Sequence, residues 1–151
     1  MNRTIMYLAV VAFIVVALLT PFELFGVPLA PLAAIVMGAG AGWWVSSTRP
    51  EHTAGSAARA GAWVGLGALL GSIAGLAVLA LWIGNIPEVQ AFVQSSEPHP
   101  EARIPTDWIA PLGALAGVVV GFFAGVIDLA LSWVAGWIAG IVNHRNVSAH
   151  V

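Results

Sequence analysis

The fold is decided by one long apolar stretch, Trp108 to Val142, which reads WIAPLGALAGVVVGFFAGVIDLALSWVAGWIAGIV. It contains a single charged residue, Asp128, and it lacks the strict apolar–polar alternation of a half-buried strand. About 20 apolar residues are enough to cross a bilayer core about 30 Å thick. The stretch therefore predicts a membrane-spanning helix that is longer than one crossing requires.

The composition of the whole chain agrees with a membrane protein. Of its 151 residues, 60% are hydrophobic and only 8% are charged, against about 25% charged in an ordinary globular domain. The mean hydropathy is +0.94. So few polar side chains cannot cover the surface of a water-soluble fold. The sequence therefore predicts an all-α integral membrane protein.

Three further apolar stretches precede the long one. Together the four predict a single membrane domain, residues 1–151, built as a bundle of four transmembrane helices at about 4–20, 27–46, 59–84 and 108–142. The first could also be a signal peptide, but the bulky residues 22–25 offer no small-residue cleavage site, so we expect it to remain as a helix.

Arginine positions predict the orientation of this bundle. In a four-pass chain, four of the five arginines fall on one side of the membrane, and the other side holds one arginine and several acidic residues. The positive-inside rule then places both termini in the cytoplasm and the 84–107 loop outside. Tryptophans near the ends of the stretches agree, because indole rings prefer the headgroup level. Prolines divide the outer loop, and Ile86–Val93 is a candidate short interfacial helix.

Glycine at four-residue spacing is the clearest motif. Residues four apart share one helix face, and a face without side chains lets another backbone approach closely. The pattern predicts glycine-zipper packing, within the chain or between chains. The residues expected to pack are Gly38 and Gly42; Gly67, Gly71 and Gly75; and Gly113, Gly117, Gly121, Gly125, Gly136 and Gly140.

Asp128 is the one ionisable residue inside a predicted span, and its depth decides its role. If Trp108 marks the outer interface, Asp128 reaches the inner one and pairs with Arg59 or Arg49. If the stretch is centred on the membrane, Asp128 lies near the midplane, where ionisable groups often carry protons or ions. We favour a boundary or structural role, and keep Asp128 with Ser132 beside it as an alternative ion or proton site.

The length of the fourth stretch is itself informative. As a straight helix it would be about 52 Å long, and fitting it into the core by tilt alone would need about 55°, beyond the usual range. Either the helix kinks near Gly125–Asp128, or its ends project into other protein. The second option favours a partner.

Several classes of function have no support in the residues. There is no cysteine, no basic patch for nucleic acid, and no histidine inside a span. We therefore expect no catalytic residues, no cofactor, no metal site and no enzyme activity. Composition and topology resemble small glycine-rich four-helix membrane proteins of bacteria, which implies the inner (plasma) membrane.

Two functions remain. The preferred one is a non-catalytic accessory or scaffold subunit, in contact with membrane lipid, that packs through its glycine faces with other transmembrane helices, in a homo-oligomer or a larger membrane complex. The alternative is a small channel or an ion- or proton-coupled transporter that uses Asp128.

Overall fold

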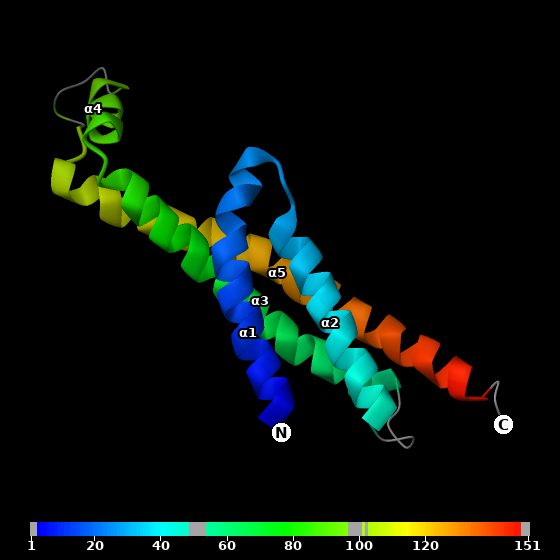
Figure 1. Ribbon diagram of the computed structural model, residues 1–151. Helices are drawn as coiled ribbons and strands as arrows, with labels where there is room; N and C mark the ends of the chain where they lie inside the picture. Colours follow the sequence, from blue (N-terminus) through cyan, green and yellow to red (C-terminus); the bar gives the residue numbers. More distant parts are fainter. Residues whose placement is uncertain (1–2, 49–53, 97–100, 102, 149–151) are drawn as a thin grey trace.

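The structure is a computed structural model that describes residues 3–48, 54–96, 101 and 103–148. Every element in these ranges is helical (Figure 1). In chain order they are α1 (Arg3–Leu19), the 3-10 turn η1 (Thr20–Phe25), α2 (Leu29–Thr48), α3 (Ala54–Gly84), α4 (Pro87–Ser96) and α5 (Thr106–Ser148).

Four of these segments are long and apolar enough to cross a membrane, which confirms the prediction of an all-helical, multi-pass membrane protein. They are Arg3–Glu23, Leu29–Thr48, Ala54–Gly84 and Thr106–His144. The third begins at Ala54, before its predicted start, because the small residues after Thr53 continue the helix toward its N-terminus. The fourth continues beyond Val142. The candidate helix in the 84–107 loop is present as α4, which has no buried residue.

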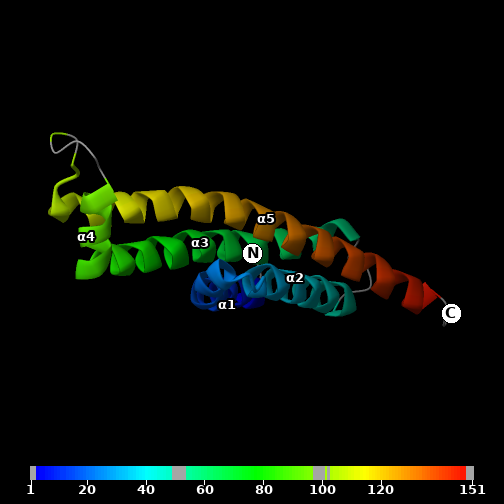
Figure 2. The same cartoon turned by 90° about the horizontal axis from the view of Figure 1, so that it is seen from above.

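The helices form two antiparallel hairpins that lie in two layers. The α1–α2 hairpin crosses the α3–α5 hairpin at a clear angle (Figure 1), and the view from above separates the two layers (Figure 2). The turn between α1 and α2 closes at Gly26, whose φ of +77° is left-handed and therefore suits glycine. Its N–H donates to the carbonyl oxygen of Glu23, at 2.9 Å.

Small residues form the interior of the bundle, and large apolar residues form its surface. The fully buried apolar residues are mostly alanines, with Val16 and Val64 among them. Large side chains such as Leu115 and Phe123 are 61% and 66% exposed. A water-soluble protein would reverse this arrangement, since burial of large apolar groups drives its folding. In lipid the exposed side chains meet acyl chains, and close backbone packing holds the helices together.

The long helix α5 runs without interruption through the Gly125–Asp128 region. It has 43 residues, or about 64 Å of helix, and it curves gradually along its length rather than breaking (Figure 2). The α3–α5 hairpin consequently extends well past the α1–α2 hairpin toward α4 (Figure 1). We call this extension the outer arm; it comprises residues 76–84 of α3 and 106–120 of α5.

Candidate functional site: a buried carboxyl group

The glycines of α5 lie against α3, on the face that α5 turns toward its hairpin partner. A Cβ added at Gly121 would lie 2.7 Å from the Ser72 carbonyl oxygen, and one added at Gly125 would lie 2.7 Å from the Leu69 Cα. Gly117 is equally close to the backbone at Leu76. Gly113 is different, because its nearest such contact is an ordinary 3.4 Å. At the loop end a Cβ on Gly84 would lie 2.6 Å from the Ala110 Cα, so the α3–α5 backbones are close at these positions except at Gly113.

Two further sets of glycines join one hairpin to the other. On α3, Gly67, Gly71 and Gly75 face the α1 backbone at Ala9, Phe13 and Ala17. On α2, Gly38 faces Ser132 and Gly42 faces Gly136, while Gly136 and Gly140 of α5 also meet Ala57 of α3. The small faces are thus occupied within one chain.

Asp128 is enclosed where these faces meet. Only 1% of the residue is exposed, and the Ser72 hydroxyl donates a hydrogen bond of 2.7 Å to its Oδ2. Along α5 it lies near the midpoint between Ala110 and Asn143. Ala110 packs on Gly84 at one end of the bundle, and the Asn143 side chain donates to Ser46 at the other. Asp128 is therefore close to the middle of the bundle.

Asp128 does not form the ion pair with Arg59 that was expected for a carboxylate at the boundary. Its hydrogen-bond partner is Ser72, which is separated from Arg59 by several turns of α3. Arg59 instead lines a surface groove with Trp133 and Trp137. Arg49, the other expected partner, is outside the described residues. The expected ion pair with Arg59 is absent because the two residues lie at different levels of the bundle.

A second carboxyl group, Glu23, lies in the turn between α1 and α2. Glu23 follows α1 in η1, where the Thr20 hydroxyl donates 2.7 Å to the Val16 carbonyl oxygen and Pro21 opens the turn. The Glu23 side chain is half-buried there. Its apolar neighbours, Phe22 and Val27 among them, were the only sequence signal for burial.

One oxygen of each carboxyl group is buried and unpartnered. Glu23 Oε1 and Asp128 Oδ1 have no hydrogen-bond partner among the described residues. The Ser132 hydroxyl does not serve Asp128, since it donates to the Gly61 carbonyl oxygen at 2.8 Å and so ties α5 to α3. An unpaired polar atom inside a membrane protein is costly. These two oxygens are thus the chemically unusual feature of the described interior.

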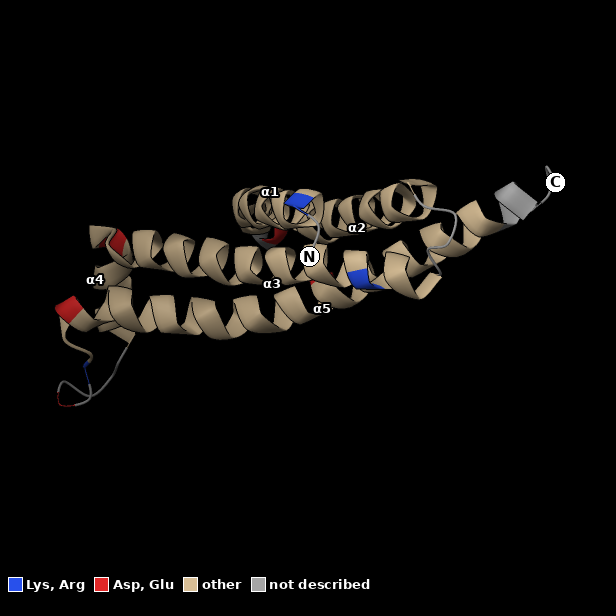
Figure 3. Ribbon diagram, turned by 90° about the horizontal axis from the view of Figure 1, so that it is seen from below, with Lys and Arg blue, Asp and Glu red and all other residues tan. Residues whose placement is uncertain are grey.

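The other charged residues of the described chain lie toward the ends of the helices or in the loop beside α4 (Figure 3). Glu88 and Asp107 are exposed near α4, at the loop end of the long hairpin. No group of three or more His, Cys, Asp or Glu residues that could hold a metal occurs within the described ranges. His144 is exposed on α5, and the other three histidines lie outside those ranges.

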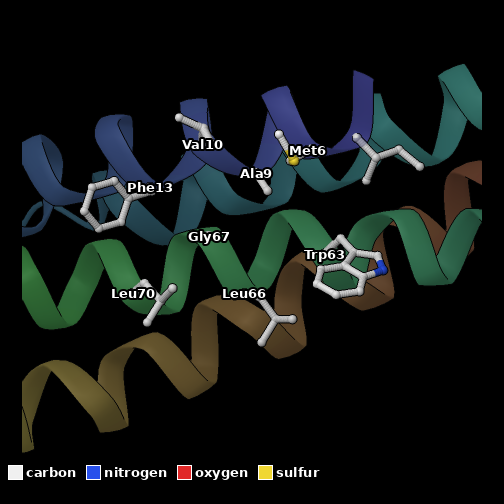
Figure 4. A pocket seen from close by; sticks show the side chains of 9 residues that line it. Met6, Ala9, Val10, Phe13, Trp63, Leu66, Gly67 and Leu70 are labelled. Atoms are coloured by element: carbon white, nitrogen blue, oxygen red, sulfur yellow. The ribbon is translucent and has the colours of Figure 1, made fainter. Parts of the chain in front are cut away.

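An apolar groove of about 290 Å³ runs between α1 and α3 (Figure 4). Met6, Val10 and Phe13 line it from α1, and Trp63, Leu66 and Leu70 from α3. The floor is formed by Ala9 and Gly67, where the helix backbones meet. The groove opens on the apolar surface, where its shape and chemistry suit a lipid acyl chain and offer little to a polar ligand.

No protein-family model matches the chain, and comparison with curated proteins and with solved structures finds no match.

Proposed function

We propose that the chain is a non-catalytic integral membrane subunit that assembles into a homo-oligomer or a larger complex of the bacterial inner (plasma) membrane. The observation that carries this proposal is the uninterrupted length of α5. About 64 Å of helix is twice the thickness of a bilayer core, and its apolar residues continue to Val142. One bilayer crossing does not require the full length of α5. A partner protein beside the outer arm would cover the apolar surface of the extra length.

The glycine faces have a supporting role in this proposal. We propose that zipper-like packing of α5 on α3, and of each hairpin on the other, builds a stable single-chain bundle. Because these faces meet inside the chain, the surface left for a partner is the large-residue surface of the outer arm. Trp82, Trp108 and Leu115 are 66%, 57% and 61% exposed there, and aromatic side chains are enriched at protein interfaces.

Site-specific photocrosslinking tests the partner surface. A photoreactive residue at Leu115, on the outer arm, is expected to form a covalent adduct with a protein in native membranes. The matched control is Val36 of α2, which is 69% exposed but lies outside the arm, and we expect it to label lipid. Protein adducts of equal yield from both positions, or from neither, would contradict the proposed surface.

We propose an orientation with both termini in the cytoplasm, on the basis of the arginine distribution. The chain has no cysteine, so a single Ser95→Cys substitution in α4 reports the side of the outer loop. Ser95 is exposed, and a membrane-impermeant thiol reagent is expected to label it in intact spheroplasts. Strong labelling only in inverted vesicles would show the opposite orientation.

A second candidate function is a small channel or an ion- or proton-coupled transporter that uses Asp128. The central position of this carboxyl group and its unpartnered oxygen favour it. The enclosed hydrogen bond to Ser72 and the engagement of Ser132 with Gly61 favour the subunit instead. Loss of a proton or cation flux in liposomes on Asp128→Asn would support transport, and no flux in the wild type would reject it.

A further inference from the structure

We propose that the bundle binds an anionic phospholipid, with one acyl chain in the apolar groove between α1 and α3 and the phosphate at Arg3 and Arg59. Such a lipid site goes beyond both functions above, because it needs neither a partner protein nor a flux. Its support is the chemistry of the groove and the position of the two arginines at one end of it.

The groove between α1 and α3 is built for an apolar chain. Its volume is about 290 Å³, and apolar side chains from both helices line it. Trp63 lies at one end of it and Leu70 toward the other (Figure 4), so the groove follows about 10 Å of α3. Because it opens on the surface that meets lipid, an acyl chain can enter it sideways from the bilayer, whereas a polar ligand would find no hydrogen-bonding partner there.

Two arginines lie beyond the same end of this groove. α1 and α3 run parallel, because successive glycines of α3 meet successive residues of α1: Gly67 meets Ala9, Gly71 meets Phe13 and Gly75 meets Ala17. On α1, Arg3 precedes Ile5, where the groove begins. On α3, Arg59 lies one helical turn before Trp63, where the groove begins on that helix. Both arginines are exposed, so a lipid whose acyl chain fills the groove can place its headgroup beside them.

The surroundings of Arg59 suit a phosphate at the membrane surface. Arg59 shares a second surface groove with Trp133 and Trp137, and indole rings prefer the headgroup level. The acidic residues of the described ranges lie elsewhere, with Glu23 in the turn between α1 and α2, Asp128 in the middle of the bundle, and the others near α4. A guanidinium group matches the geometry of a phosphate, and basic residues at the membrane surface attract anionic lipids.

Native mass spectrometry of the purified full chain in detergent tests the headgroup. Phosphatidylglycerol is expected to bind at least about fivefold more tightly than phosphatidylcholine with the same acyl chains. Arg59→Gln should weaken the binding of phosphatidylglycerol about fivefold. The control is Arg103→Gln, which removes the same charge from an exposed position between α4 and α5 and should leave the binding unchanged. Equal affinity of the wild type for the two lipids, or equal weakening by the two variants, would overturn the proposal.

A second pair of variants tests the acyl chain. Val10→Trp fills the groove and should lose most of the binding of either lipid, while Val36→Trp, at a position of α2 that is 69% exposed and outside the groove, should bind both as the wild type does. Lipid binding by Val10→Trp at the wild-type level would contradict a chain in the groove. Inorganic phosphate should not displace phosphatidylglycerol from the wild type, and displacement would show that the arginines hold a free anion instead. If Val10→Trp fails to fold, the arginine variants still decide the proposal.

Discussion

Gly42→Leu is expected to separate the two hairpins or to lower the stability of the folded chain by about 3 kcal/mol, the upper part of the range for an overpacked interior. A Cβ at Gly42 would fall on the backbone of Gly136 in α5. The backbones of α2 and α5 cannot move aside as a flexible side chain could. A leucine therefore forces α2 away from α5, and equilibrium unfolding in detergent measures the loss.

Gly40→Leu is the matched control for this prediction. It lies close to Gly42 on the same helix, but a Cβ there would meet nothing within 4 Å. We expect no loss of stability, because the position is open and leucine favours a helix over glycine by somewhat less than about 1 kcal/mol. If Gly40→Leu and Gly42→Leu destabilise the protein equally, the contact between α2 and α5 does not explain the effect.

Gly121→Leu is expected to have a similarly large effect on the contact between α3 and α5. Its added Cβ would lie 2.7 Å from both the Ile73 Cα and the Ser72 carbonyl oxygen. Ser72 also binds Asp128, so the displaced backbone would disturb that hydrogen bond as well. We expect a loss of about 3 kcal/mol in detergent unfolding.

Val119→Leu is the control for Gly121→Leu, because Val119 is 51% exposed on the same helix and an added methylene there has free space. Its expected effect is below about 0.5 kcal/mol. Equal losses from the two variants would mean that the α3–α5 contact is not the tight one described above.

The helices could be predicted from the sequence because lipid imposes simple requirements on each one separately. A span needs length and apolarity, and those properties can be read from residues such as the run Trp108–Val142. The glycine spacing also identified helix faces suited to close approach. It could not say which faces meet, because Gly38 and Gly121 look alike in sequence although they contact different helices.

The surroundings of the buried carboxyl group could be predicted only in part. Asp128 stood out because apolar residues surround it in the sequence. Its partner, Ser72, lies on α3 and depends on the alignment of α5 along α3, which the tryptophans alone do not fix. Glu23 follows a complete span, and its partial burial depends on the turn at η1.

The central claim is that the chain belongs to a membrane assembly, and its mass in the native membrane tests this most directly. Native mass spectrometry of the protein, extracted in nanodiscs without detergent, should find it in a particle larger than the 15.6 kDa chain. Integer multiples of that mass would identify a homo-oligomer, and additional chains a larger complex. A particle containing one copy of the chain with lipid alone would contradict the proposed function.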